Sequence, residues 1–120
     1  MAVTKALSLH GIHSQYGTLP NLLTTINTLV DVGIVVTALL RTKHFQFNAT
    51  TNSLTVAILG SVDGGVTFPI TVAAEFPVAT GATPVMKVDT TFYTHLKVQV
   101  RPTVGGSHGT LTTKWAGASF

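Results

Sequence analysis

The sequence predicts an all-β fold in which two sheets pack face to face, and three observations support this prediction. Residues 93–101 alternate between apolar and polar side chains, the pattern of a half-buried strand, with Leu96, Val98 and Val100 at the apolar positions. Thr and Val supply 36 of the 120 residues (21 and 15), and β-branched side chains favour strands over helices. Turn signals recur every 8 to 12 residues or so, which is typical of a β-sandwich or jelly roll of about eight short strands.

The first twenty residues predict an N-terminal strand and arm. Val3, Leu7 and Leu9 alternate loosely, and a segment rich in Gly, His and polar residues follows them up to residue 20. Residues 21–120 then predict one β-sandwich domain, because a chain of 120 residues has the size of a single domain and no linker divides it.

Residues 21–30 are compatible with two structures. Leu22, Ile26 and Val30 lie at helical spacing, which leaves a short helix open. Thr24, Thr25 and Thr28 lower helix propensity, so extended structure is favoured.

The remaining strands follow from short apolar or alternating runs. Residues 33–40 are almost continuously apolar, which predicts a strand that is buried on both faces or lies in a subunit contact. Residues 43–47 and 53–61 flank a polar turn, and this predicts that they pair as a hairpin. Further strands are expected at residues 68–76, 85–88, 93–101 and 110–116, with a glycine turn at residues 63–65.

The composition predicts association with other protein chains. Only 9% of the residues are charged, whereas 45% are apolar, so the closed domain should still expose apolar surface. The longest apolar segment, residues 32–40, is too short to cross a membrane, so no membrane partner is expected. We therefore expect a homo-oligomer or neighbouring copies on a larger assembly.

The charge pattern argues against a nucleic-acid partner. The net charge is +3, but the seven basic residues are dispersed and form no basic stripe with interleaved aromatics. The chain has no cysteine, so it offers neither a disulfide framework nor a thiolate metal site.

No catalytic residue, metal site or cofactor is expected. The four carboxylates belong to Asp31, Asp63, Glu75 and Asp89, and two of them lie in expected turns, which leaves little material for a paired acid and base. Two histidines, His10 and His13, are spaced so that both could bind the same metal ion, and His44, His95 and His108 could add ligands. Without a nearby carboxylate or cysteine this is a weak metal pattern.

The terminal segments hold the residues that we expect to contact other chains. Aromatic side chains dominate the energetics of interfaces, and segments near the termini can reach across to neighbours. Trp115 and the other large aromatics could equally fill the core. The predicted contact residues are Tyr16, Leu19, Trp115 and Phe120.

Residues 54–68 (LTVAILGSVDGGVTF) and residues 92–105 (FYTHLKVQVRPTVG) resemble the small all-β structural proteins of tailed bacteriophage particles. The resemblance extends over roughly half of the chain, from about residue 45 to residue 116. It implies a jelly-roll or sandwich fold and a capsid decoration (cement) protein, with tail and neck proteins in the same class. It assigns no functional residues.

The sequence therefore predicts a non-enzymatic virion structural protein. It would be made in the host cytoplasm, since the N-terminus lacks the continuous apolar core of a signal peptide. The alternative is a carbohydrate-binding adhesion module, which would need exposed aromatics beside acidic or amide side chains. Tyr16, Tyr93 and Trp115 are the amphipathic aromatics available for such a site, and only Tyr93 has an acid, Asp89, within five positions.

Overall fold

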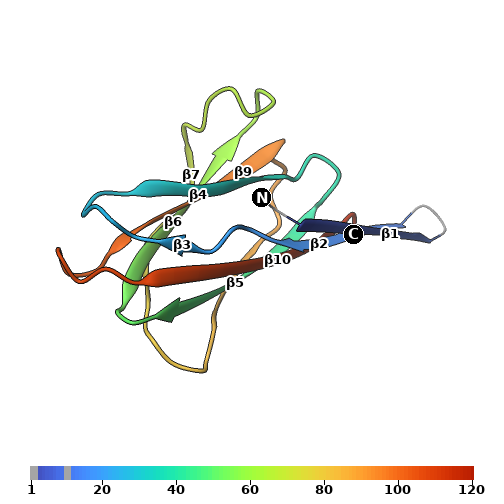
Figure 1. Ribbon diagram of the computed structural model, residues 1–120. Helices are drawn as coiled ribbons and strands as arrows, with labels where there is room; N and C mark the ends of the chain where they lie inside the picture. The colour runs from blue at the N-terminus through green and yellow to red at the C-terminus, as the bar shows by residue number, and fades with distance from the viewer. Residues whose placement is uncertain (1–2, 10–11) are drawn as a thin grey trace.

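The computed structural model describes residues 3–9 and 12–120, with side chains from Ser14 onward, and this part of the chain is all-β without a helix (Figure 1). The strands are β1 Val3–Leu9, β2 Ile12–Thr18, β3 Leu22–Leu23, β4 Val30–Val36, β5 Thr42–Thr50, β6 Leu54–Ser61, β7 Ile70–Val78, β8 Val85–Asp89, β9 His95–Pro102 and β10 Thr110–Ala118. The predicted fold class is confirmed.

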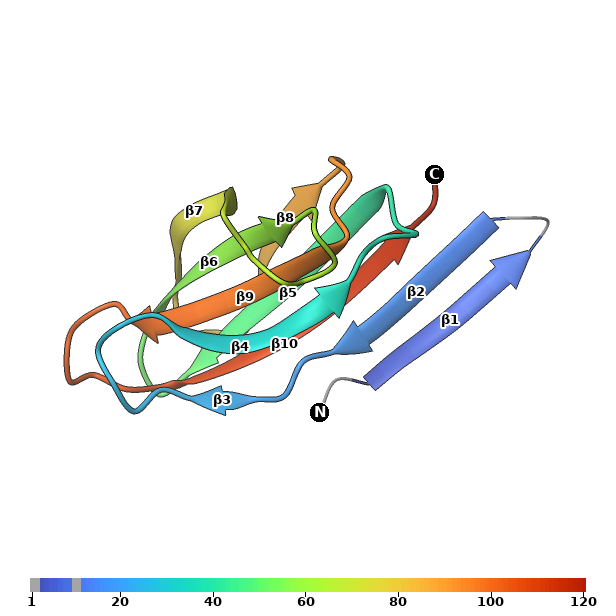
Figure 2. The ribbon, with the colours of Figure 1, turned by 90° about the horizontal axis from the view of Figure 1, so that it is seen from above.

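The strands form two antiparallel sheets that pack as a β-sandwich. The six-stranded sheet has the order β1-β2-β10-β5-β8, and β3 pairs with β10 beside this path. The four-stranded sheet has the order β4-β9-β6-β7 and lies over part of the larger sheet (Figure 2). The hairpin of β1 and β2 lies to one side, where the smaller sheet does not cover it (Figures 1 and 2). The jelly-roll form of the prediction stays a prediction.

The core lies between the two sheets and is built from alternate residues of each strand. Leu96, Val98 and Val100 of β9 are completely buried, as their alternation predicted. The expected inward residues of β6, Leu54, Val56 and Ile58, are also buried. The larger sheet contributes Phe45, Phe47, Leu111 and Trp115 to the same cluster. The ring centroids of Phe47 and Phe76 lie 5.4 Å apart and connect the two sheets.

The predicted hairpin between residues 43–47 and 53–61 is wrong. β5 belongs to the six-stranded sheet and pairs with β10 and β8, whereas β6 belongs to the other sheet and pairs with β7 and β9. The turn between them, with Thr51 at a φ of 78°, carries the chain from one sheet to the other. Both strands point alternate apolar residues into the same core, although β6 is buried along nearly its whole length, so this alternation is the same whether they pair or stack.

Nearly all connections between successive strands after β3 also carry the chain from one sheet to the other. From β3 to β10, successive strands lie in different sheets except β6 and β7, which are neighbours in the smaller sheet. The turn between β6 and β7 contains the predicted glycines, and Gly64 and Gly65 have φ angles of 77° and 85° that favour glycine. The glycine turn is therefore confirmed.

Two stretches differ from or refine the expectations. Residues 21–30 contain the short strand β3 and no helix, so the favoured extended structure is confirmed there. The apolar run at residues 33–40 is not buried on both faces, because β4 ends at Val36 and a turn follows it. β4 is an edge strand of the smaller sheet, and it leaves Ile34 and Val36 exposed.

The N-terminal strand is present as β1, but the arm expected after it contains a second strand. β2 pairs with β1 along its whole length and with β10 over residues 14–18. Behind it, Leu19 is buried in the core and its backbone N–H donates to the carbonyl of Thr113. β2 and β3 raise the number of strands from the expected eight or so to ten in the described residues.

Lys43 is a buried charge that holds the end of the larger sheet together. Its side chain is 1% exposed, and its ammonium lies 2.8 Å from the carboxylate of Asp89 on the neighbouring strand β8. The same ammonium donates to the carbonyls of Arg41 and Thr91. All three donors of the lysine are used, so it links β5 to the connection between β8 and β9.

Replacing Val98 with aspartate is expected to lower the free energy of unfolding by more than about 4 kcal/mol, because an unpaired carboxylate would enter the core. The matched control is Gln99→Ala, since Gln99 points to the other face and bonds only the exposed Asp31. That variant should change stability by about 0.5 kcal/mol or less. Urea unfolding followed by circular dichroism measures both, and equal losses would contradict the assigned core.

Replacing Lys43 with methionine is expected to cost about 3 kcal/mol, because Asp89 and two carbonyls lose a buried partner. Arg101→Met is the control, since its ion pair with Glu75 is partly exposed, with 32% and 44% of the two side chains accessible, and should contribute less than about 1 kcal/mol. Thermal or urea unfolding of the two variants checks the ranking. A smaller loss for Lys43→Met than for Arg101→Met would show that the buried pair is not a stabilising link.

Candidate functional site

The candidate site is the surface of the six-stranded sheet that points away from the core, and we call it the outer face. It consists of the residues of β2, β5, β8 and β10 that point away from the core. Register sets these residues in rows across the sheet, and one row runs Tyr16, Ala116, His44, Val88 over four strands. The next row runs Thr18, Lys114, Gln46, Met86.

The outer face exposes large apolar groups around shallow hollows. Tyr16, Met86 and Val88 are each about half exposed, at 49%, 50% and 58%. Small residues leave room between them: a hollow of about 350 Å³ lies over Ala116 and Ala118 and reaches Phe120. A second hollow of about 140 Å³ lies beside Met86 and Lys114. Such an arrangement can accept side chains of a partner.

Charge separates the outer face from the opposite surface of the molecule. Among the described residues of the outer face, Lys114 is the single charged one, and no carboxylate lies there. The exposed surface of the smaller sheet instead carries two ion pairs, Lys97 with Asp31 at 3.4 Å and Arg101 with Glu75 at 2.7 Å. That surface also exposes Ile34 and Val36, but burying it would remove its ion pairs from water, whereas the outer face can be buried against a partner with little loss of charge solvation.

The four predicted contact residues fall into two classes. Tyr16 is exposed at the edge of the outer face, and Phe120 is 69% exposed beside it. Leu19 and Trp115 are 2% and 5% exposed, and both belong to the core. Trp115 pairs in register with Gly17 on one side and with Phe45 on the other. Only Tyr16 and Phe120 are therefore available to a partner.

The three amphipathic aromatics differ in exposure. Tyr93 is 9% exposed and lies in the core with Trp115, which leaves Tyr16 as the exposed one of the three amphipathic aromatics. No carboxylate accompanies Tyr16 on the described outer face.

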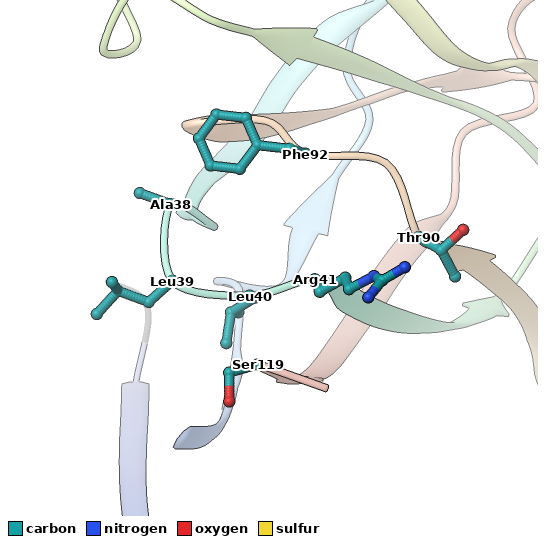
Figure 3. Close-up of a pocket in the computed structure, with 7 residues that line it drawn as sticks. All are labelled: Ala38, Leu39, Leu40, Arg41, Thr90, Phe92 and Ser119. Atoms are coloured by element: carbon teal, nitrogen blue, oxygen red, sulfur yellow. The ribbon is translucent and has the colours of Figure 1, made fainter. Parts of the chain in front are cut away.

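A further hollow of about 590 Å³ opens at the end of the sandwich (Figure 3). It lies between the turn from β4 to β5 and the connection from β8 to β9, with Leu39 and Phe92 on its rim. Arg41 is the one charged residue that lines it, and no acid or histidine does. The hollow is apolar and open, and it lacks a general base.

All four carboxylates of the chain are engaged in structural contacts. Asp31, Glu75 and Asp89 form the three ion pairs already described. Asp63 accepts hydrogen bonds from the hydroxyls of Ser61 at 2.7 Å and Thr67 at 2.6 Å, and from the backbone N–H groups of Val66 and Thr67. These bonds, that of Ser61 first, hold the pKa of Asp63 well below its usual range.

The histidines do not come together in the described part of the chain. His44 lies on the outer face, His95 on the opposite surface and His108 in the loop before β10. His10 and the side chain of His13 lie outside the described residues. Within the described residues, no group of three or more potential ligands could hold a metal ion. Within the same residues, no helix is long and apolar enough to cross a membrane.

Most residues of the outer face are not predictable from the sequence. Met86, Val88, Ala116 and His44 lie on three different strands, and only the strand order brings them together. A weak signal was present in residues 110–118, where Lys114, Ala116 and Ala118 alternate with buried Leu111, Thr113 and Trp115. This alternation shows that one side of β10 faces outward, but not what lies beside it.

Replacing Asp63 with asparagine is expected to lower stability at pH 7, because the carboxylate accepts four hydrogen bonds in the turn. The pKa of Asp63 is lower in the folded chain than in the unfolded chain, where it is about 3.9, so this stabilisation is present above about pH 4 and is lost as the pH falls. The difference in urea midpoint between the variant and the wild type should therefore narrow from pH 7 to pH 2.5. A difference that stays constant over this range would contradict the ionised-turn interpretation.

Comparisons with models of protein families, with curated proteins and with solved structures find no match for this chain. No family assignment follows, so a function has to be argued from the outer face and from the groups around it.

Proposed function

We propose that this chain is a non-enzymatic structural protein of a bacteriophage particle, and that it decorates the capsid by binding capsid subunits through the outer face. The observation that carries the proposal is the outer face itself, with half-exposed Tyr16, Met86 and Val88 and with Lys114 as its one described charge. The resemblance of residues 54–68 and 92–105 to virion structural proteins supplies the class of partner.

The size of the outer face fits a specific protein interface. The nine residues of β10, at about 3.3 Å each, give a length of about 30 Å, and four strands about 4.8 Å apart give a width of about 19 Å. The footprint is then roughly 600 Å², and the relief of the side chains raises the accessible area towards the ~800 Å² per partner of a stable complex. One neighbouring subunit would suffice to cover it.

The chemistry of the outer face suits binding rather than turnover. Tyr16 combines a large apolar ring with a hydroxyl, a type of side chain that is enriched among residues that dominate interfaces. The hollows over Ala116 and Ala118 offer pockets for side chains of the partner. The engaged carboxylates and the spread of His44, His95 and His108 agree with a role that needs no acid, base or metal.

Many copies bound in this way would strengthen a shell. Each copy that bridges capsid subunits stabilises the closed shell by its binding free energy. Opening the shell must then break many such contacts together. The protein would then act as cement, made in the host cytoplasm and resident in the virion.

An antibody against the purified chain, applied to particles produced by the genome that encodes it, tests the location by electron microscopy. Label spread over the head is expected for a decoration protein. Label confined to the neck or tail would place the chain elsewhere in the virion and overturn the capsid proposal. Unlabelled particles would overturn the virion proposal altogether.

Replacing Ala116 with glutamate tests the surface. Particles assembled without this chain should bind the wild type, and Ala116→Glu should weaken the affinity at least about tenfold, because the new carboxylate would be buried without a partner. Ala82→Glu is the matched control, since Ala82 is exposed in the turn between β7 and β8, away from the outer face. Circular dichroism should show that both variants are folded, and equal binding by the two would rule out the outer face as the contact.

A further inference from the structure

β1 is the open edge of the larger sheet. It pairs with β2 over all seven of its residues, and no described residue pairs with its other side. The backbone N–H and C=O groups on that side are therefore available to another strand. Such an edge is a template for pairing with a further chain, and proteins usually protect it.

The other edges of the two sheets are protected, which sets β1 apart. β4 has an irregularity between Asp31 and Gly33, and β7 pairs irregularly with β6 and contains Pro77. β8 has five residues, among them Lys87 and Asp89, and β3 has two residues. These are the usual devices against edge pairing: bulges, proline, charge and short length. By contrast, β1 has seven residues in continuous register with β2 and contains no proline, and Lys5 is its single charged residue.

We propose that β1 pairs antiparallel with β1 of a second copy of this chain, so that two six-stranded sheets join across a two-fold axis. This inference does not depend on which partner the outer face binds. An antiparallel pair of identical strands is self-complementary, as a two-fold contact requires, and every copy brings the matching edge. The joined sheets would also place the outer faces of two copies in one continuous surface.

The sequence of β1 selects one register for this pair. The centre of Val3–Leu9 is Ala6, so full overlap sets Ala6 opposite Ala6 of the other copy and Lys5 opposite Leu7. A pair centred on Lys5 would set the two lysines opposite each other and would shorten the overlap to residues 3–7. Like charges directly opposite destabilise a strand pair, so the register centred on Ala6 is favoured.

A single engineered cysteine tests both the pairing and the register, because the natural chain has none. Directly opposite residues of antiparallel strands have Cα atoms about 4.5 or 5.5 Å apart, and both spacings fall within the roughly 4.4–6.8 Å range of disulfides. Ala6→Cys in the full chain should therefore form a disulfide-linked dimer on mild oxidation. Ser8→Cys is the control, since its copies would lie about 14 Å apart in this register and should stay monomeric on a non-reducing gel.

The association constant of the full chain, measured by analytical ultracentrifugation, provides the second test. The wild type should form a dimer, and Ala6→Lys should weaken the dimer about fivefold or more by setting two lysines opposite each other. Ser8→Lys, whose lysine would face Thr4 of the other copy, should leave the dimer nearly unchanged.

Three results would overturn the proposal. The first is a wild-type chain that does not associate with itself. This outcome includes a chain whose β1 edge pairs only with a strand of another protein. The second is equal cross-linking of Ala6→Cys and Ser8→Cys. The third is a dimer that Ala6→Lys does not weaken although the variant keeps its thermal transition. None of these results concerns the outer face, so the proposal for capsid binding would be judged separately by Ala116→Glu.

Discussion

The packing of Leu96, Val98 and Val100 against the phenylalanines of the opposite sheet is the interaction on which the rest of the structure depends. These three residues of β9 are completely buried, and they share one core with Phe45 and Phe47 of the larger sheet and with Phe76 of their own sheet. Each sheet can bury only one face in this core. The other face must therefore be made compatible with water or covered by a partner.

The two sheets meet this requirement in different ways. The smaller sheet carries two ion pairs on its outer surface, and Lys97 also lies 4.4 Å from the centre of the Phe68 ring. The larger sheet leaves Tyr16, Met86 and Val88 exposed and places only Lys114 among its described outward charges. Only 9% of the residues are charged, so few charges are available for the two surfaces. The proposed interface is the surface on which the charges are missing.

The two proposed contacts use two features of the same sheet. The outer face would offer side chains and hollows to a capsid subunit, and the β1 edge would offer backbone groups to a second copy. Side-chain contacts on a face and hydrogen bonds along an edge are independent, so one can be changed without the other. The buried lysine, Lys43, and the turn around Asp63 instead belong to the stability of the sandwich itself.

The sequence by itself determined the fold class, the inward residues of β6 and β9, the glycine turn at Asp63 and most strand positions, because alternation and turn chemistry are local properties. It could not determine that β5 and β6 stack instead of pairing, nor that β2 joins β10. Strand partners are chosen by long-range packing, and both arrangements bury the same alternating residues. The outer face follows from those partners: Tyr16, Ala116, His44 and Val88 come from four strands and become neighbours only in the tertiary structure. For the same reason Trp115, an aromatic near the C-terminus, lies in the core, because β10 is a central strand of its sheet.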